Sequence, residues 1–301
     1  MDLYSEARIL PYLLRGRLDV RDHRDLVAVG LSRSAIEWRA GRAGLVRAHR
    51  SVYLDGPHAP DLLDLARATL AVCAPGTLLG FHTAAALYGF GVLDSAEIHV
   101  VMEAGASIPQ RRGIAVHQTV LGPGPAVEVR GLPCVTAARC AIDLARTVPA
   151  MDGLPVLDAA IASLATDRDA LLREVAIHSG LRGVRRAHRL VELADGRAEC
   201  RQESQLRLLV VEAGIPGFVP QLEVRGRSGF PRFFLDLADP ERRIGLEYDG
   251  ASHLDKGRLR LDRQRHNWLE TRGWRMRYFT DHDLYRCPDD LVSTLRVSVG
   301  R

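Results

Sequence analysis

The sequence has little lysine, little cysteine and no long apolar run, and each shortage excludes a class of protein. The five cysteines lie far apart and form no CxxC pair, so neither a zinc site nor a disulfide framework is expected. No run of about 18 apolar residues occurs, so we expect no membrane span. The first residues carry acidic side chains and lack the apolar segment of a signal peptide, which favours a cytoplasmic protein.

The charge balance is mildly basic, at +4, and comes almost wholly from arginine, because Lys256 is the only lysine. This bias is typical of a GC-rich genome, so the total number of arginines says little about nucleic acid. Local clusters of arginine are more informative. A length of 301 residues and a hydrophobic share of 47% are typical of a soluble globular protein with two or three domains. The helices and strands expected in its three segments predict an α/β multidomain fold.

Residues 1–56 have the pattern of a small helical module followed by a β-hairpin. Helices are expected over 3–15, 21–29 and 33–40, and short strands over 45–47 and 51–54. Helix, tight turn, helix and hairpin in this order predict a winged helix-turn-helix domain that binds DNA. Arg33, Arg39 and Arg42 would lie on or beside the recognition helix, and Arg47 on the wing. The alternative is a helical bundle whose arginines form only a solvated face.

Residues 57–195 are expected to form an α+β middle region without a catalytic constellation. The sequence predicts helices over 62–73, 81–87, 137–145, 151–163, 168–178 and 182–194, with strands over 98–102 and 114–117. His82, His99 and His117 have no partners at the spacing of metal ligands, so a structural role is favoured for all three. The Gly-, Pro- and Val-rich segment 121–129 predicts a loop.

Residues 196–301 show the order helix, three strands, helix, strand and helices. The helices are expected over 199–213 and 255–272, with shorter ones after Thr280 and over 289–297. The strands are expected over 219–225, 230–238, 244–248 and 274–279. A mixed sheet flanked by helices follows from this order. Trp268 and Trp274 are expected in the core.

Carboxylates occupy the ends of two neighbouring strands in this last segment. Glu247 and Asp249 are two residues apart and project to the same side, where Asp236 of the adjacent strand can meet them. Glu203 on the preceding helix can reach the same pocket. Such oxygen ligands suit Mg²⁺ or Mn²⁺, and the metal could activate water for phosphodiester hydrolysis. The alternative is a set of strand-end carboxylates without metal.

Proton transfer and DNA contact are expected from the residues that follow. His253 has an ordinary pKa near neutrality and is the candidate general base or acid, with Lys256 as a further candidate. The helix over 255–272 is basic, and Arg258 and Arg265 are expected to contact the DNA backbone. The alternative for these arginines is a solvated helix face with ion pairs one turn apart.

The acidic pattern resembles a known enzyme superfamily. Glu203, Asp236 and the E-x-D-G-x-x-H run at 247–253 resemble the PD-(D/E)XK nucleases, and in particular the Vsr-like endonuclease domain. The resemblance implies a restriction-endonuclease-like αβββαβ domain that acts as a Mg²⁺-dependent DNA endonuclease. Asp236, Glu247 and Glu203 would bind the metal, with Asp249 and His253 completing the catalytic set. Asp249 occupies the superfamily's lysine position, and the Vsr-like subgroup also lacks this lysine.

The N-terminal part carries a second resemblance. Residues 31–53 resemble the winged helix of AbiEi-type antitoxins, and residues 82–89 and 132–145 resemble that family's second region. This implies DNA binding, autoregulation of an operon and a toxin partner.

Two functions are therefore left open, and both take DNA as the partner, alone or with a toxin or a second copy of the chain. The favoured one is a metal-dependent DNA endonuclease of repair or phage defence, for which RNA is the alternative substrate. The other is a non-catalytic repressor or antitoxin with a degenerate nuclease fold.

Overall fold

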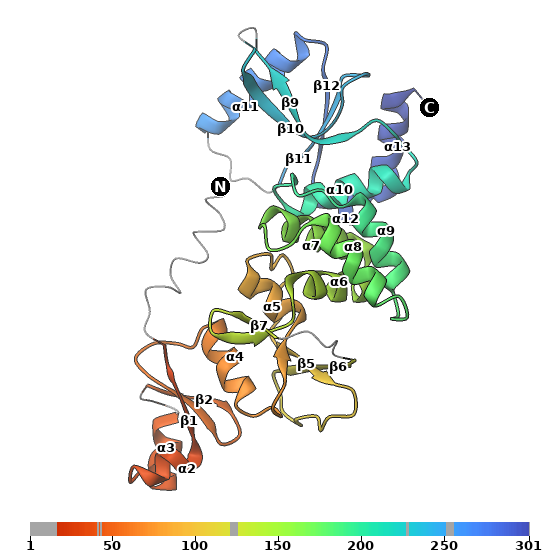
Figure 1. Cartoon of the computed structure of the whole chain (residues 1–301). Coiled ribbons are helices and arrows are strands. Elements are labelled where there is room, and N and C mark those ends of the chain that lie inside the picture. The colour runs from red at the N-terminus through yellow and green to blue at the C-terminus, as the bar shows by residue number, and fades with distance from the viewer. Residues whose placement is uncertain are drawn as a thin grey trace. The chain divides into compact units, whose positions relative to one another are not determined.

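Three β-sheets organise the part of the chain that the computed structural model describes, namely residues 17–40, 42, 44–120, 126–226, 229–250 and 256–300, with the backbone alone at 256–260. The chain is thus a multidomain α/β protein, and it divides into the units Met1–Asp143 and Leu144–Arg301 (Figure 1). The helix expected over 3–15 and the candidate base His253 lie outside the described residues. As separate domains, the segments 1–56, 57–195 and 196–301 stay a prediction.

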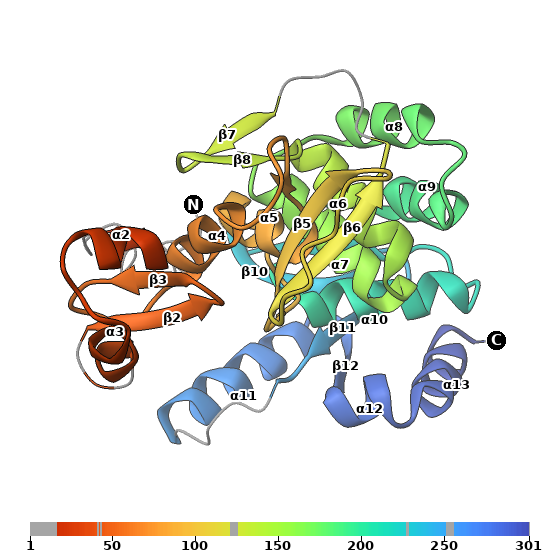
Figure 2. The ribbon, with the colours of Figure 1, turned by 90° about the horizontal axis from the view of Figure 1, so that it is seen from below.

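The first sheet has the order β1-β3-β2 and carries two helices (Figure 2). Both β1 (Asp19–Asp22) and β2 (Leu45–His49) pair antiparallel with β3 (Val52–Asp55). Between β1 and β2 the chain forms α2 (His23–Ala28) and α3 (Arg33–Ala40). Leu26 of α2 and Ile36 of α3 are buried together with Leu45 and Tyr53, so one small core holds both helices on the sheet.

The start of α2 corrects the sequence prediction, which placed a helix over 21–29. Residues 21 and 22 belong to β1, and Asp22 ends the strand because its carboxylate accepts a hydrogen bond from the Arg24 N–H at 2.7 Å. The range of α3 is confirmed. Ser32 begins it as expected, since its Oγ accepts from the Ala35 N–H at 3.2 Å.

The second sheet has the order β6-β5-β4-β8-β7. Its strands are β4 (Leu78–Leu79), β5 (Ile98–Glu103), β6 (Ile114–Thr119), β7 (Val127–Val129) and β8 (Leu132–Cys134), and α5 (Phe81–Tyr88) follows β4. The loop predicted over 121–129 is wrong at 127–129. Arg130 and Gly131 both have a positive φ, which makes a tight turn and lets β7 pair antiparallel with β8.

One helix, α4 (Leu62–Leu70), belongs to the cores of both sheets. Ala66 is buried among the side chains of the second sheet, and Ala68 packs with Leu54 of β3. Buried Asp64 accepts from the Leu18 N–H and pairs with Arg67, whose guanidinium donates to the Leu18 carbonyl. These contacts explain why the first unit contains both sheets.

The second unit begins within α6 (Ala137–Thr147) and continues as a group of helices. These are α7 (Ala150–Ala162), α8 (Arg168–Ile177), α9 (Val184–Leu193) and α10 (Arg201–Glu212), as the sequence predicts to within a few residues. The α7–α10 contact contains a buried ion pair between Asp158 and Arg207. Asp158 also accepts from the Asp195 N–H at 2.7 Å, so α7, α10 and the chain after α9 are linked through one carboxylate.

The third sheet is mixed, with the order β12-β11-β10-β9. The strands β9 (Val219–Arg225), β10 (Pro231–Asp239) and β11 (Ile244–Tyr248) are antiparallel, and β12 (Arg275–Phe279) pairs parallel with β11. The remaining helices are α11 (Lys256–Glu270), α12 (Asp281–Tyr285) and α13 (Pro288–Val299). Trp268 and Trp274 pack against the buried cluster around Leu235 and Leu269, which confirms their expected place. No helix of the described residues is long and apolar enough to span a membrane.

Candidate functional site

Four exposed arginines of the first unit lie on α3, in the turn after it and on the β2–β3 hairpin, and we call them the arginine surface: Arg33, Arg39, Arg42 and Arg47. The Arg33 Nε lies 3.4 Å from the Glu37 Oε1. Because both side chains are mostly exposed to water, this ion pair contributes little to the free energy of unfolding. The other three make no ion pair with any residue that the structure describes. Their charge is therefore available to a ligand.

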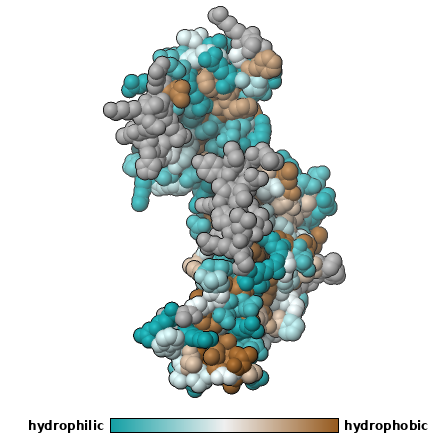
Figure 3. Space-filling model, turned by 90° about the vertical axis from the view of Figure 1, so that its left-hand side faces the viewer, coloured by the Kyte–Doolittle hydropathy of each residue, from teal (hydrophilic) through white to brown (hydrophobic). Residues whose placement is uncertain are grey.

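The backbone under the arginine surface is fixed by apolar burial on one side of α3. Ile36 is fully buried, whereas Trp38 is 56% exposed on the same helix. Figure 3 shows apolar and hydrophilic residues mixed over the part of the first unit that holds α2 and α3. Val27 and Val46 are among the exposed apolar side chains there. An exposed aromatic ring on the helix that also carries Arg33 and Arg39 suits contacts with nucleic acid.

A second group of candidates is the acid cluster, which comprises Glu203 of α10, Asp236 of β10 and Glu247 of β11. The pairing of β10 with β11 ends at Leu237 and Leu246, and the two strands then separate. Beyond this point the Asp236 Oδ2 accepts from the Tyr248 N–H at 2.9 Å, in place of a backbone carbonyl. Glu203 and Glu247 are each only 8% exposed. The charge of Asp236 acts on the carboxyls of both Glu203 and Glu247, so the three side chains lie within electrostatic range of one another, and their role as metal ligands stays a prediction.

Burial dominates the electrostatics of the acid cluster. It raises the pKa of Glu203 to about 7, and the charge of Asp236 adds to the effect. Burial also raises the pKa of Glu247 to about 7, although the charge of Arg265 opposes the shift. Burial is also the main cause that raises the pKa of Asp236. Such a cluster attracts positive charge or protons.

Protein groups partly satisfy these carboxylates. Glu203 Oε2 accepts from the Gln221 side chain at 2.9 Å and from the Glu199 N–H at 3.0 Å. The Arg265 guanidinium pairs with Glu247 and donates to the Phe234 carbonyl at 2.5 Å. Arg265, which the sequence places on the DNA backbone, therefore serves as the counter-charge of Glu247 here, and its contact with DNA stays a prediction.

The fit of the acid cluster to a metal is partial. Its oxygen donors are of the kind that Mg²⁺ and Mn²⁺ take, but Arg265 already supplies positive charge to Glu247. Within the described residues, no group of three or more His, Cys, Asp or Glu side chains is arranged to hold a metal. Asp249 lies exposed just beyond β11, and the side chains of His253 and Arg258 lie outside the description. Their roles remain predictions.

Three histidines lie close together, namely His82 of α5, His99 of β5 and His117 of β6. The His99 Nδ1 is 2.9 Å from the His117 Nε2, and the His99 Nε2 is 2.9 Å from the Ser95 Oγ. The ring centres of His82 and His99 are 4.4 Å apart. The pKa of His99 is lowered to about 4, chiefly by burial and to a smaller extent by the neighbouring His82. This ring is therefore neutral at pH 7. The contacts place the three imidazole rings against one another and against Ser95, and the structural role expected for the histidines stays a prediction.

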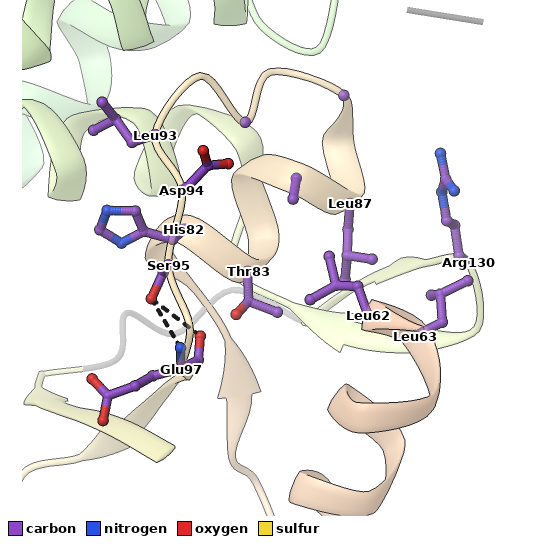
Figure 4. Close-up of a pocket in the computed structure, with 13 residues that line it drawn as sticks. Leu62, Leu63, His82, Thr83, Leu87, Leu93, Asp94, Ser95, Glu97 and Arg130 are labelled. Carbon is purple, nitrogen blue, oxygen red and sulfur yellow. Dashed lines mark hydrogen bonds between the residues drawn. The ribbon is translucent and has the colours of Figure 1, made fainter. Parts of the chain in front are cut away.

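Beside the histidines lies a cavity of about 500 Å³ that the sequence did not reveal. Figure 4 shows Leu62, Leu63 and Leu87 gathered near Arg130 at one end, and His82 with Asp94 at the other. The residues that line the cavity come from three stretches separated along the chain, so no local sequence pattern could predict the cavity. Its apolar and polar ends give it the character of a small-ligand or side-chain pocket.

The fold and the candidate sites define the class of the protein. It is a multidomain α/β protein whose first unit carries exposed arginines on a helix and on a hairpin. The family model of the AbiEi antitoxin C-terminal domain matches residues 70–193, from the last residue of α4 to the last residue of α9. This match confirms the AbiEi resemblance of the middle region. It does not cover residues 31–53, and the resemblance at 196–301 to Vsr-like endonucleases has no support from the comparisons.

Two whole-length relatives come from Mycobacterium tuberculosis. They are the uncharacterized protein MT2308 of strain CDC 1551 / Oshkosh and the uncharacterized protein Rv2248 of strain ATCC 25618 / H37Rv. Each is 30% identical to this chain over 275 residues, which cover 90% of this chain and 98% of the relative. The chain belongs to the family of these mycobacterial proteins and contains the AbiEi antitoxin C-terminal domain.

Proposed function

We propose that this chain is a DNA-binding regulator of the antitoxin type, which represses the operon that encodes it. The observation that carries the proposal is the arginine surface, where Arg39, Arg42 and Arg47 are exposed and lack ion pairs with described residues. The AbiEi match supports the toxin–antitoxin setting. This is the reading that the sequence alone ranked second, behind an endonuclease.

In this proposal the first 56 residues act as a winged helix-turn-helix. Helix α3 enters the major groove, where an arginine can donate two hydrogen bonds to the O6 and N7 of guanine. The β2–β3 hairpin lies along the adjacent backbone, and Arg47 neutralises a phosphate. The buried Ile36 supports this role, because a recognition helix must be held rigidly to read base edges.

The experiment is a binding titration with duplex DNA from upstream of the encoding gene, followed by fluorescence anisotropy. Wild type should bind this duplex more tightly than a scrambled duplex of the same length. Arg39→Ala and Arg42→Ala should reduce that preference, since base contacts carry it. Arg173→Ala is the matched control, because Arg173 is also exposed and without an ion pair to a described residue but lies on α8. Equal affinity of wild type for both duplexes would contradict the proposal.

A toxin partner, a second copy of the chain and a cytoplasmic location complete the proposal. All three derive from the family resemblance and from the sequence. Co-expression with a toxin gene encoded in the same operon should restore growth, and light scattering should show whether one or two copies bind the operator. Growth arrest that persists despite soluble protein would contradict the antitoxin role.

A second candidate function is that of a metal-dependent endonuclease with a Vsr-like domain at 196–301. Its specific support is the acid cluster and the αβββαβ order of α10 to β12. Glu203, Asp236 and Glu247 would hold Mg²⁺ or Mn²⁺, which would supply an activated water. Asp236→Asn is the test in a plasmid cleavage assay with either metal. Cleavage by wild type that the variant loses would support the enzyme, and cleavage that persists in the variant would exclude this site.

A further inference from the structure

The cavity beside the histidines has an apolar wall and two separate polar ends. Its volume of about 500 Å³ lies in the range of pockets that hold a small organic molecule. The apolar wall is formed by side chains from the start of α4, from α5 and from the loop after α5: Leu62, Leu63, Ala86, Leu87 and Leu93. Figure 4 shows His82 and Asp94 at one end of the cavity and Arg130 at the other. All of these residues belong to the first unit, so the cavity is complete within it.

Arg130 supplies a positive charge that no carboxylate of the described residues neutralises. Its side chain is partly buried at one end of the cavity. The backbone of Arg130 has a φ of 54°, in the left-handed region that arginine rarely adopts, and Asn or Gly would form such a hairpin turn at lower cost. The turn itself therefore does not call for an arginine. Because the guanidinium stays protonated and can donate two parallel hydrogen bonds, it suits the carboxylate of a ligand.

His82 offers a hydrogen-bond donor at the opposite end. Burial lowers the pKa of His82, so the ring is neutral at pH 7 and carries one proton. The Nδ1 is buried and has no hydrogen-bond partner among the described residues. A proton on the Nδ1 would leave a buried N–H unpaired, which is rarer in proteins than an unpaired acceptor, so the proton belongs on the Nε2. The Nε2 also lacks a partner in the described part of the chain but is not sealed off, so it can donate to a ligand.

Asp94 supplies a hydrogen-bond acceptor at the same end as His82. Its carboxylate is exposed and has no ion pair with any residue that the structure describes. A hydroxyl group can accept from the His82 Nε2 and donate to Asp94. An ammonium group can only donate, and a second carboxylate would be repelled by Asp94. This end of the cavity therefore favours a ligand hydroxyl, as the Arg130 end favours a ligand carboxylate.

Hydrogen bonds and close packing hold the walls of the cavity in place. The first turn of α4, which forms part of the apolar wall, is fixed by the capping box of Asp61 and Asp64. The loop after α5 is fixed at Ser95, whose Oγ lies 2.9 Å from the His99 Nε2. A Cβ at Gly91 would lie 2.8 Å from the backbone of α5, so the loop packs closely on this helix. The cavity is thus formed before a ligand arrives, and binding loses little conformational entropy.

We propose that this cavity binds a small organic molecule of the phenolic acid class, with an apolar body, a carboxylate at one end and a hydroxyl at the other. The carboxylate pairs with Arg130, the apolar body packs against the leucines of α4 and α5, and the hydroxyl bonds with His82 and Asp94. A ring suits the apolar body because it has few rotatable bonds to immobilise. The inference goes beyond the proposed DNA-binding function and does not rest on it.

The test measures the binding of three small molecules to the full chain by NMR, from the shifts of the His82 ring resonances. The compounds are para-hydroxyphenylpropionate, which carries both end groups, phenylpropionate, which lacks the hydroxyl, and para-ethylphenol, which lacks the carboxylate. Wild type should bind the first compound most tightly. Each of the other two should bind about tenfold more weakly, since a hydrogen bond to a charged group is lost. Absence of binding, or equal affinity for all three compounds, overturns the proposal.

Two variants place the compounds in the cavity. Arg130→Ala should weaken para-hydroxyphenylpropionate by about tenfold and leave para-ethylphenol unchanged, because only the first compound has a carboxylate that loses its partner. Unchanged binding of para-ethylphenol also shows that this variant is folded. Ala86→Phe should weaken all three compounds, because Ala86 is exposed to the cavity and a ring there occupies it.

Arg173→Ala is the matched control, because it removes an exposed arginine of α8 outside the cavity and should bind all three compounds as wild type does. Unchanged affinity for para-hydroxyphenylpropionate in both Arg130→Ala and Ala86→Phe would place the compound elsewhere and overturn the proposal. No step of this test uses DNA. Its failure therefore leaves the DNA-binding regulator standing, and a failure of DNA binding leaves the cavity site standing.

Discussion

The arginine surface of the first unit and the acid cluster of the second differ in how their charges are accommodated. Arg39, Arg42 and Arg47 face water and lack ion pairs with described residues. Glu203 and Glu247 are almost fully buried, and both have pKa values raised to about 7. An exposed charge costs the fold little and is available to a partner. A buried charge is costly unless it is paired, so its effects appear first in stability and in pH dependence.

The same contrast exists among the arginines themselves. Arg207 is buried against Asp158 and Leu193, and the half-buried Arg265 pairs with Glu247 and donates to the Phe234 carbonyl. Both are parts of the fold. Arg39 and Arg47 touch no carboxylate of the described chain and are exposed. Residue type therefore does not identify a DNA contact, and the absence of an internal counter-charge is the more useful criterion.

The largest expected effect comes from breaking the buried pair. Arg207→Met should lower the free energy of unfolding by about 3–5 kcal/mol, because it leaves Asp158 buried without its cation. Urea unfolding at pH 7 measures the change. The double variant Arg207→Met/Asp158→Leu should recover much of the loss, since no buried charge remains. A loss below about 1 kcal/mol in Arg207→Met would show that the pair is solvated.

A comparable change on the arginine surface should affect binding alone. Arg39→Ala/Arg47→Ala should weaken binding to the upstream duplex by about 2–4 kcal/mol, while the free energy of unfolding changes by no more than about 0.5 kcal/mol. Anisotropy and urea unfolding give the two numbers, and Arg173→Ala provides the control for loss of charge. A large loss of stability would mean that these side chains have structural partners.

The buried carboxyl of Glu203 should make the free energy of unfolding depend on pH. Its pKa is about 7 in the folded protein and near 4.5 when unfolded, so the folded state binds more protons between these values. Stability should therefore be greatest below about pH 4.5 with respect to this group and should fall as the pH rises toward 7. Glu203→Gln should flatten this fall and stabilise the protein at pH 8, on the order of 1–3 kcal/mol. If the free energy of unfolding changed with pH in the same way in wild type and in Glu203→Gln, the raised pKa of Glu203 would be contradicted.

The smallest expected effect is a change in tryptophan fluorescence. Trp38 is 56% exposed on α3, whereas Trp268 and Trp274 pack in the core of the second unit. Binding of DNA by α3 should quench part of the tryptophan emission. Trp38→Phe should bind with similar affinity and lose the quenching. Quenching that remains in the variant would move the contact away from α3.

Much of the fold follows from local pattern, as two elements illustrate. The range of α3 was predicted correctly from Ser32, a good N-cap, and from the glycine after the last turn. The strands β9 to β11 were predicted to within a residue, because apolar runs alternate there with clear turns. By contrast, β1 has the sequence Asp-Val-Arg-Asp, which has no strand character of its own and depends on pairing with β3.

The candidate sites were less predictable, because they depend on contacts between residues distant in sequence. Asp236 and Glu247 could be chosen from their strand positions, but the pairing of Arg265 with Glu247 could not be predicted. Leu62 and Arg130 lie far apart in the sequence, so the cavity that both line exists only in the folded unit. The endonuclease was ranked first because local acidic spacing is visible in a sequence, whereas an unpaired arginine is not.

A promoter reporter tests the central claim most directly. The upstream DNA drives the reporter in cells that express wild type, Arg39→Ala/Arg47→Ala or Asp236→Asn/Glu247→Gln at equal levels. A DNA-binding regulator predicts repression by wild type, loss of repression in the arginine variant and full repression in the acid-cluster variant. Equal repression by wild type and the arginine variant, or loss of repression only in the acid-cluster variant, would contradict it.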